Sequence, residues 1–428
     1  MELLSPHESS SAASALHQAL VDTLQRDGSI QTPRVLAAFR AIPRHLFLPD
    51  VALDKVYQNE PVATLRQPNG RALSSSSRPA IMALMLEQLR LEPGLRVLEI
   101  GTGTGYNAAL LAHIVGETGH VTTIDIDQEL VDTARLHLGA AGYAHVHLVC
   151  GDGGFGHPPL APYDRIIATT SVGTLPPPWR AQLHAHGRLL VPLSLRGPIL
   201  SVAFVPAVDH LVSVAAQPYG FIPMRGAFAG VAVSVPLGPV PGLWLELADQ
   251  RAVDAKAVYT RLRGARRLHR TPVSVTVAEF FGGVNLWVAL HENDSCALHT
   301  TGAVAAQGIL PGLLGTTTLG PSYFTSGMRS DSGVCMLSGP PDHPPPRQRW
   351  PLHPVSDEQP FELWMCSFGS DLGLAERLMA HLAAWETAGR PTTQNLRIRA
   401  YPLENSYTPT TNEVLLQTAW TQFVLDWQ

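Results

Sequence analysis

The sequence predicts an α/β protein with a doubly wound, mostly parallel sheet, followed by a second unit of mixed α and β structure. Three observations support this fold class. An apolar run at 96–100 leads into a glycine-rich turn and then into a helical run that begins at Tyr106. Beyond this helix, β-branched strands continue to alternate with helical segments. Two of these strands end at or just before an aspartate, Asp125 and Asp152, where parallel sheets of this class bind ligands.

Length and composition limit the class of protein. The chain has 428 residues, which is more than one ordinary hydrophobic core can organise, so two domains are expected. Charged residues make up 15% and hydrophobic residues 45%, which is typical of a globular protein. The formal net charge of −5 argues against a nucleic acid or an anionic membrane as a partner. Four scattered cysteines without a Cys-x-x-Cys pair predict neither a disulfide framework nor a zinc ribbon.

Targeting segments are not evident in the sequence. The N-terminus has no basic region before an apolar core, and no apolar run is long enough to span a bilayer. We therefore expect a cytoplasmic protein. The expected division is a flexible tail at 1–13, a first domain at 14–225 and an α+β domain at 226–428.

Local patterns place the elements of the first domain. Helices are expected at 14–26, 35–42, 80–89 and 128–138, and strands at 96–100, 121–125, 146–150, 163–168 and 187–192, with edge strands at 199–205 and 211–215.

The glycine-rich turn points to a ligand. Gly101, Gly103 and Gly105 would let a ligand lie against bare backbone at the N-terminus of the following helix. The third glycine of a dinucleotide fingerprint is replaced by Tyr106. Glu99 two residues before the first glycine gives the pattern acid-x-Gly-x-Gly-x-Gly, which resembles the first motif of S-adenosylmethionine-dependent methyltransferases. The alternative is a structural glycine turn with Glu99 as a solvated strand end.

Two aspartates extend this prediction to a nucleoside. Asp125 could accept hydrogen bonds from both ribose hydroxyls, and Asp152, beside Gly153, could accept one from an adenine amine. Taken alone, Asp125 could equally cap the helix at 128–138, and Asp152 could be a plain turn residue. Because the glycine turn and both acids follow strand ends, the three together favour a nucleoside site.

The first half of the chain resembles the protein-L-isoaspartate O-methyltransferase family over roughly residues 15–225. The matching stretches are Pro43-Arg44-His45-Leu46-Phe47, Ser77-x-Pro79, Val97 to Gly103, Gly151-Asp152-Gly153, Pro162-Tyr163-Asp164 and Gly187-Arg188-Leu189. The resemblance implies a Rossmann-like class I methyltransferase fold, S-adenosyl-L-methionine as methyl donor and carboxyl O-methyl transfer.

The resemblance also assigns roles to a run of serines. It places Ser77 where the methyl donor meets the substrate carboxylate, with Ser75 and Ser76 touching the cofactor. The cofactor-binding set expected is Ser75, Ser76, Glu99, Gly101, Gly103, Gly105, Asp125, Asp152 and Gly153. The family usually has bulkier residues in this stretch, so the run Ser74 to Ser77 departs from its pattern. Apart from the resemblance, Ser77 could simply be the N-cap of the helix after Pro79.

The second half shows no catalytic motif of its own. Strand-like runs are expected at 243–247, 273–277, 284–290, 396–401 and 421–428, a helix at 372–388, and an extended proline-rich loop at 339–354. His291, Asp294 and His299 have loosely metal-like spacing, but without further ligands no metal is expected.

The long form is similar to the methyltransferases of ribosomally made, post-translationally modified peptides such as lanthipeptides and graspetides. That similarity implies methylation of an aspartate in a modified precursor peptide, which leads to a succinimide (aspartimide) and on to isoaspartate. The second half would then recognise the peptide. The alternatives are a repair methyltransferase for isoaspartyl residues in damaged proteins and a cofactor-binding scaffold without turnover. The sequence does not indicate an oligomeric state.

Overall fold

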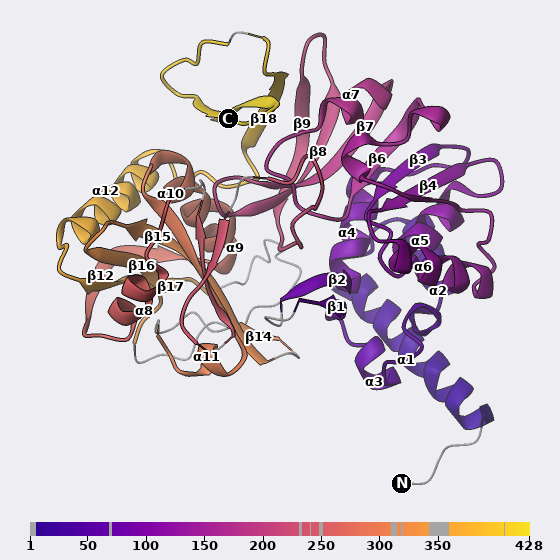
Figure 1. Cartoon of the computed structure of the whole chain (residues 1–428), viewed down its shortest axis with the longest axis horizontal. Coiled ribbons are helices and arrows are strands. Elements are labelled where there is room, and N and C mark those ends of the chain that lie inside the picture. Colours follow the sequence, from indigo (N-terminus) through magenta and orange to yellow (C-terminus); the bar gives the residue numbers. More distant parts are fainter. Residues whose placement is uncertain are drawn as a thin grey trace.

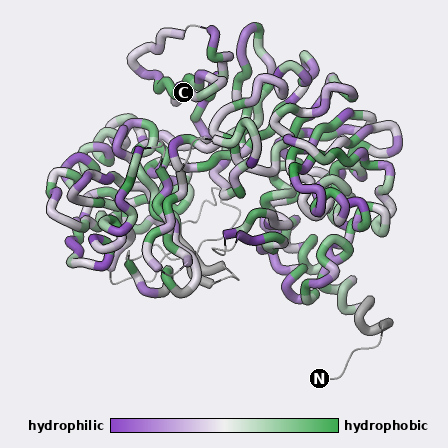
Figure 2. Tube along the Cα trace, in the orientation of Figure 1, coloured by the Kyte–Doolittle hydropathy of each residue, from purple (hydrophilic) through white to green (hydrophobic). Residues whose placement is uncertain are grey.

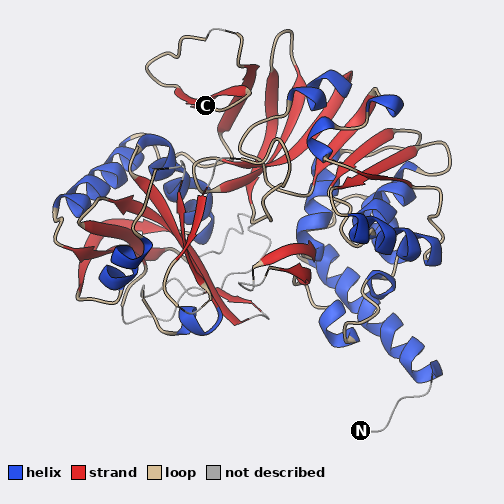
Figure 3. Ribbon diagram, in the orientation of Figure 1, coloured by secondary structure: helices blue, strands red, loops and turns tan. Residues whose placement is uncertain are grey.

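A computed structural model describes residues 6–67, 71–230, 233–239, 241–247, 251–309, 315–317, 320–341, 359–405 and 407–428. Two sheets organise the chain, and Figures 1 and 3 show them in two units side by side. Among the described residues, the first unit holds a sheet of ten strands, and the second holds a sheet of eight. A separate two-stranded hairpin, β1–β2, projects from the first unit toward the second.

Helices come first along the chain. The elements before the large sheet are α1 (Pro6–Arg26), α2 (Pro33–Ala41), the 3-10 turn η1 (Arg44–Phe47), α3 (Leu53–Val56), β1 (Val62–Arg66), β2 (Ala72–Ser76) and α4 (Pro79–Leu89). The predicted loose tail at 1–13 is therefore corrected from Pro6 onward, because α1 already includes these residues. Alanines and Glu8, which favour helices, outweigh the serines there. Residues 1–5 lie outside the described part.

The large sheet then forms from alternating strands and helices. Its elements are β3 (Arg96–Ile100), α5 (Tyr106–Val115), β4 (His120–Asp125), α6 (Gln128–Ala140), β5 (His147–Cys150), the 3-10 turns η2 (Gly153–Phe155) and η3 (Pro158–Leu160), β6 (Tyr163–Ala168), α7 (Pro177–Gln182), β7 (Leu183–Ser194), β8 (Ile199–Pro206) and β9 (Leu211–Pro218).

Strand order fixes where a ligand can lie. The order is β19-β20-β18-β9-β8-β7-β6-β3-β4-β5, and the five strands β5-β4-β3-β6-β7 are parallel. The chain moves from β3 to β4 in one direction and later to β6 in the other, so a topological switch point lies between β3 and β6. The carboxyl ends of these strands carry the glycine turn. The predicted doubly wound sheet is confirmed.

Side chains alternate between two cores across this sheet. Val97 packs with α4 and α5 on one face, while Leu98 and Ile100 pack with Trp179 of α7 on the other. α4 and α5 are apolar on nearly every side and are buried accordingly. In Figure 2 the hydrophobic stretches run through the interior of both units. The sheet is thus a rigid layer between two apolar cores.

The second unit is inserted between β9 and β18. It contains β10 (Val233–Pro236), β11 (Leu243–Leu247), α8 (Ala255–Leu262), β12 (Arg266–Val275), α9 (Val277–Glu279), the π-helical turn η4 (Phe280–Val284), α10 (Asn285–His291), β13 (Ser295–Thr301), α11 (Gly302–Ala306), β14 (Gly315–Thr317), β15 (Gly320–Arg329), β16 (Gly333–Ser338), β17 (Phe361–Gly369) and α12 (Gly373–Thr387). We call residues 233–387 the inserted domain. Its antiparallel order is β10-β11-β13-β15-β16-β17-β12, with β14 beside β15.

The last strands return to the large sheet. β18 (Leu396–Pro402), β19 (Val414–Gln417) and β20 (Thr421–Trp427) extend it beyond β9, with Arg399 paired to Val212. The predicted continuous domain at 226–428 is therefore corrected: its C-terminal part belongs to the first unit. The physical reason is that Ile398, Phe423 and Leu425 complete the apolar core beside β9.

The run at 284–290 was expected to be a strand, and the structure corrects it to helix α10. Leu286 and Leu290 pack against the large sheet, whereas Val284 and Val288 pack in the core of the inserted domain. A segment buried on both sides is apolar at nearly every position, so its hydrophobic period cannot distinguish helix from strand. The predicted helix at 372–388 is confirmed as α12. Most of the proline-rich loop at 339–354 lies outside the described residues.

Candidate functional site

The glycine turn lies at the switch point between β3 and β6. Gly101, Gly103 and Gly105 have φ of 99°, 52° and 86°, in the left-handed region that favours glycine. A Cβ at Gly101 would also overlap Thr169 Oγ1, which donates hydrogen bonds to the carbonyls of Ile100 (3.0 Å) and Gly101 (2.8 Å). The turn therefore requires glycine for its own geometry and presents bare backbone at the start of α5.

Asp125 sits directly beside this turn at the end of β4. Its Oδ2 accepts a hydrogen bond from the backbone of Gly103 at 3.0 Å, and Oδ1 accepts one from Asp127 at 3.2 Å. Arg225 Nη2 lies 4.0 Å from Oδ1. The capping alternative for Asp125 is wrong, because Asp127 is the N-cap of α6 and accepts from the backbone of Glu129. The carboxylate of Asp125 is nearly buried and fixed against the glycine turn.

Asp152 lies at the end of the neighbouring strand β5. Its Oδ1 accepts from Gly154 at 2.9 Å, and its Oδ2 accepts from Ala227 at 2.7 Å. The segment that follows β9 therefore lies against this acid, and a side chain at Gly226 would overlap the carboxylate. Gly153 packs closely as well, since a Cβ there would lie 2.5 Å from Ile100 Cγ2. Asp125, Asp152 and the glycine turn thus lie at adjoining strand ends, as the sequence predicts.

Glu99 is fully buried beneath the turn, so the alternative of a solvated strand end is wrong. Its carboxylate accepts hydrogen bonds from Thr123 Oγ1 at 2.6 Å and from Asn107 Nδ2 at 2.7 Å. Burial raises the pKa of Glu99 to about 7; the two hydrogen bonds oppose this rise, and the charge of Asp125 adds to it. Glu99 ties together β3, β4 and α5 under the turn, and a cofactor contact for it stays a prediction.

The serine run begins on β2 and ends just beyond it at Ser77. Ser74 Oγ and the carbonyl of Ser75 lie 3.8 Å from the position of a Cβ at Gly103, so this strand passes over the glycine turn. Ser76 Oγ instead faces Arg44, which donates to it at 3.3 Å. Ser77 is half-buried, and its hydroxyl has no hydrogen-bond partner among the described residues.

Ser77 is not the helix cap. α4 begins at Pro79 with Arg78 at the N-cap position and no side-chain cap of its own. Asn59 Oδ1 accepts the backbone N–H of Ala80 at 3.0 Å and takes that role from another loop. The capping alternative for Ser77 is therefore wrong, and its hydroxyl is available to a ligand.

Arg44 holds the serine run in place, a role that the sequence did not indicate. Its buried guanidinium donates to the carbonyl of Val56 at 2.8 Å, of Ser76 at 3.2 Å and of Ser77 at 3.0 Å. Burial lowers the pKa of Arg44 to about 10, although nearby Tyr106 and Tyr57 counteract the shift. The only signal in the sequence is an arginine between the apolar pairs Ala41-Ile42 and Leu46-Phe47. Through these hydrogen bonds Arg44 connects the loop at 56–60 with the end of β2.

A largely buried ion pair secures the same loop. Arg78 Nη2 lies 2.5 Å from Glu60 Oε2. Burial raises the pKa of Glu60 and lowers that of Arg78, while the pairing counteracts both shifts. Backbone carbonyls, one asparagine and this pair thus fix the backbone at Ser77, two residues beyond the point where Ser75 passes the glycine turn.

The described residues contain no cluster of three or more histidine, cysteine or acidic side chains that could hold a metal ion. His291 stacks on Trp287 at a centroid distance of 3.9 Å, His299 lies beside Trp244, and Asp294 pairs with Arg251. The three residues with metal-like spacing therefore have separate surroundings. Within the described part, no helix is long and apolar enough to cross a bilayer.

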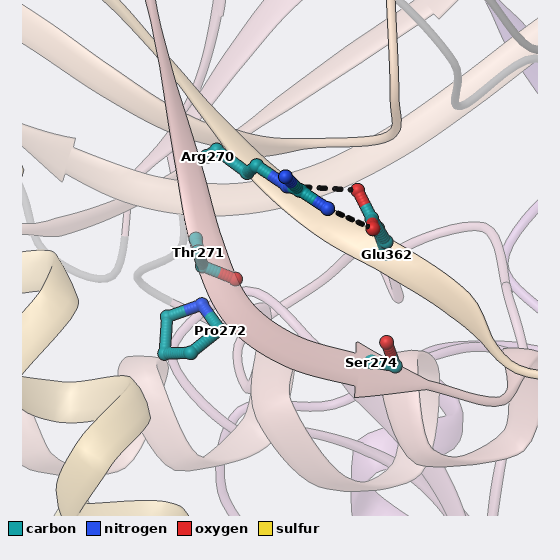
Figure 4. A pocket seen from close by; sticks show the side chains of 5 residues that line it. All are labelled: Arg270, Thr271, Pro272, Ser274 and Glu362. Carbon is teal, nitrogen blue, oxygen red and sulfur yellow. Dashed lines mark hydrogen bonds and ion pairs between the residues drawn. The ribbon is translucent and has the colours of Figure 1, made fainter.

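A surface pocket of about 360 Å³ lies elsewhere, on the inserted domain. Figure 4 shows its lining, which comprises Arg270, Thr271, Pro272, Ser274 and Glu362. Arg270 and Glu362 form an exposed ion pair across it at 2.6 Å. These residues belong to β12 and β17, which are not among the elements that carry the glycine turn or Ser77, so we do not assign the chemistry to this pocket.

Comparisons with known proteins agree with the geometry of the first unit. A sequence model described as "Protein-L-isoaspartate(D-aspartate) O-methyltransferase (PCMT)" matches residues 15–217. The chain is similar to the protein-L-isoaspartate O-methyltransferase of Methanococcoides burtonii, with 37% identity over 209 residues, which are 49% of this chain and 99% of that protein. The enzyme of the same name from Ignicoccus hospitalis is 36% identical over 209 residues, covering 45% of this chain and 96% of that one.

Solved structures include a similar protein-L-isoaspartate O-methyltransferase with 23% identity and a TM-score of 0.48, covering 90% of this chain and 96% of that chain. Another is described as a putative protein-L-isoaspartate O-methyltransferase from Plasmodium falciparum in complex with S-adenosyl-L-homocysteine. It is 18% identical, with a TM-score of 0.42, and the match covers 49% of this chain and 98% of that chain.

Proposed function

Because the chain belongs to the protein-L-isoaspartate O-methyltransferase family, we propose that it transfers a methyl group from S-adenosyl-L-methionine to a side-chain carboxylate of a protein or peptide. The observation that carries the proposal is the arrangement at one edge of the large sheet. The glycine turn, Asp125 and Asp152 lie there at adjoining strand ends, and Ser74 and Ser75 pass over the turn. This serine run leads to Ser77, whose hydroxyl has no hydrogen-bond partner among the described residues and could orient an acyl oxygen.

The residues at this edge fit the donor. Asp125 is positioned to accept hydrogen bonds from ribose hydroxyls, and Asp152 to accept one from the adenine amine. Gly103 leaves room for the close approach of a ligand, since nothing among the described residues lies nearer than 3.8 Å to the position of a Cβ there. The amino-acid end of the donor would lie near buried Glu99, whose carboxylate attracts positive charge.

Alignment accounts for most of the expected catalysis. When bound, S-adenosylmethionine supplies a methyl group already activated by its positive sulfur. A substrate carboxylate is nucleophilic without a base, so the protein has only to orient it and exclude water. Ser77 can donate a hydrogen bond to the oxygen that does not attack. Arg44 and Asn59 hold the backbone around Ser77, so its hydroxyl stays in place.

Two substrate classes fit this chemistry. The comparisons favour an isoaspartyl residue in damaged proteins, since the two relatives described above both bear the name protein-L-isoaspartate O-methyltransferase. The inserted domain favours a second candidate, an aspartate in a modified precursor peptide, because the family match ends at Gln217 and leaves the domain for substrate recognition. In that case the following backbone amide nitrogen would attack the carbonyl carbon of the methyl ester and expel methanol, which gives a succinimide.

Mass spectrometry separates these two candidates. The chain and donor are incubated with a short isoaspartyl peptide, with the same peptide containing aspartate, and with cyclised precursor peptides. Methylation of the short isoaspartyl peptide alone supports repair. A methyl gain on a cyclised peptide, followed by loss of methanol, supports peptide tailoring. No methyl gain on any of them, despite donor binding, contradicts both and leaves the scaffold.

Replacing Ser77 with Ala tests its assigned role. The variant should bind donor normally but transfer methyl groups about 10-fold or more slowly, as expected for one lost orienting hydrogen bond. The matched control is Ser370→Ala, an exposed serine of the inserted domain, which should methylate at the wild-type rate. Equal rates for Ser77→Ala and the control would remove Ser77 from the mechanism.

A further inference from the structure

The serine hairpin, defined here as β1, β2 and the flanking residues Gln67 and Arg71, contacts the inserted domain through Arg71. Arg71 stands just before β2, and its carbonyl accepts the backbone N–H of Gln67 at 2.8 Å across the hairpin. Its Nη2 lies 3.8 Å from Oε1 of Glu246 on β11. Figures 1 and 3 show β1 and β2 projecting toward the inserted domain. The strand that leads to Ser77 is therefore tied to the second unit near its start.

Glu246 occupies an ordered position on the inserted sheet. Along β11, Leu243, Leu245 and Leu247 point into the core of the inserted domain, so Trp244 and Glu246 lie on the opposite face. Ser234 on β10 is the cross-strand neighbour of Glu246, and its hydroxyl donates to Oε1 at 2.7 Å. The carboxylate is thus oriented by its own domain before Arg71 approaches it.

The charge of Arg71 acts on the side chains of this face. Burial raises the pKa of Glu246, while the hydrogen bond from Ser234 and the charge of Arg71 counteract the rise. Burial also lowers the pKa of His299 to about 4, and the charge of Arg71 lowers it further. His299 lies opposite Trp244 on β13, with ring centroids 5.6 Å apart. Arg71 therefore influences two separate side chains of one surface.

The pair is partly desolvated. The side chains of Arg71 and Glu246 keep 32% and 20% of their exposure, less than a typical surface pair such as Arg270–Glu362, at 68% and 43%. Reduced solvent screening makes such a contact stronger than a fully exposed one. It is also separate from the apolar junction at α10, where Leu286 packs against the large sheet.

We propose that Arg71 is a positioning residue for methyl transfer, which holds the serine hairpin against Glu246 so that the inserted domain sets the placement of Ser77. The inference rests on the function proposed above. In this arrangement, a substrate bound by the inserted domain meets a serine whose position that same domain controls. The inserted domain thus contributes to catalytic alignment as well as to recognition.

Charge reversal provides the test. We would compare Arg71→Glu, Glu246→Arg and the double exchange by measuring kcat and KM for methyl transfer and hydrogen exchange at residues 72–77. Each single charge reversal should lower kcat about three- to tenfold, because it removes a partly buried ion pair and puts two like charges side by side. Affinity for S-adenosylhomocysteine should stay within about twofold, because the donor site is untouched. The double exchange should recover most of the lost kcat.

Controls keep the result specific. Arg270→Glu and Glu362→Arg reverse an exposed pair on the same domain and should leave kcat and exchange at 72–77 unchanged. Glu246→Gln is the substitute variant if a reversed charge prevents folding. It retains the shape of Glu246 and the hydrogen bond from Ser234, and it should lower kcat by a smaller factor than Glu246→Arg.

The inference fails if the single exchanges match wild type, or if the double exchange recovers neither kcat nor protection. If wild type methylates no carboxyl substrate, the proposed function fails by itself. In that event, faster hydrogen exchange at residues 72–77 in the single variants, with a return to the wild-type rate in the double variant, would still support the contact between Arg71 and Glu246.

Discussion

Replacing Arg44 with Met removes the guanidinium that fixes the serine run and leaves an unbranched, apolar side chain in its place. Arg44 is fully buried and joins two segments that are distant in sequence. It donates to the carbonyl of Val56 and to the carbonyls of Ser76 and Ser77. Methionine can fill the volume but cannot donate. The substitution therefore leaves these carbonyls without their partner and frees the end of β2.

The expected cost follows from the burial of these carbonyls. The bonds to Val56 and Ser76 lie in fully buried surroundings, whereas water can replace the bond to Ser77. Each buried acceptor left unsatisfied costs about 1–3 kcal/mol, so the two together cost roughly 2–6 kcal/mol. Holding a cation in this site is itself unfavourable, as the lowered pKa of Arg44 indicates. We therefore expect a net loss at the low end, about 2–3 kcal/mol.

Urea titration with peptide-resolved hydrogen exchange measures this loss. Residues 56–60 and 74–77 should lose protection at lower urea, while peptides of the inserted domain report on a region that the substitution does not touch. Arg34→Met is the matched control, since Arg34 is half-exposed and pairs with Glu92 at 3.5 Å. It should change stability by less than about 0.5 kcal/mol. Equal unfolding profiles for the two variants would refute the assigned role of Arg44.

Three further predictions concern the donor site. Asp125→Ala should weaken donor binding in calorimetry by roughly 1–3 kcal/mol, the worth of charge-assisted hydrogen bonds, and unchanged affinity would contradict the ribose contact. Burial raises the pKa of Glu99 from 4.5 to about 7, so the folded chain holds a proton that the unfolded chain releases. Stability should therefore fall by up to about 3 kcal/mol as pH rises through that window, and Glu99→Gln should flatten the slope in urea titrations. Gly101→Ala should cost about 1–3 kcal/mol through strain at φ 99°, whereas Gly139→Ala, in open space on α6, should be neutral or stabilising in the same thermal unfolding assay.

The parallel sheet and its ligand edge could be predicted because their signals are local. A glycine turn after an apolar strand and an acid at the end of β4 each lie within a few residues of the element they define. Parallel strands then bring their carboxyl ends to one edge whatever lies between them. For this reason Gly103 and Asp125, 22 positions apart, could be placed together from the sequence alone.

Contacts between distant segments outside the parallel part of the sheet could not be predicted. Arg44 acts on backbone carbonyls up to 33 positions away, and a carbonyl leaves no residue type to recognise. Asn59 caps α4 from another loop, so the local pattern at Ser77 suggested the wrong cap. The return of β18–β20 to the large sheet depends on a free strand edge at β9, which no local pattern records. Long-range pairing, rather than weak local propensity, accounts for these errors.

The most direct test of the account is a crystal structure of the chain with S-adenosylhomocysteine and an isoaspartyl peptide. The account predicts ribose hydroxyls within hydrogen-bond distance of Asp125, the adenine amine at Asp152, and the sulfur facing a peptide carboxylate that accepts from Ser77. A nucleoside bound away from the glycine turn, or a carboxylate held far from Ser77, would contradict it.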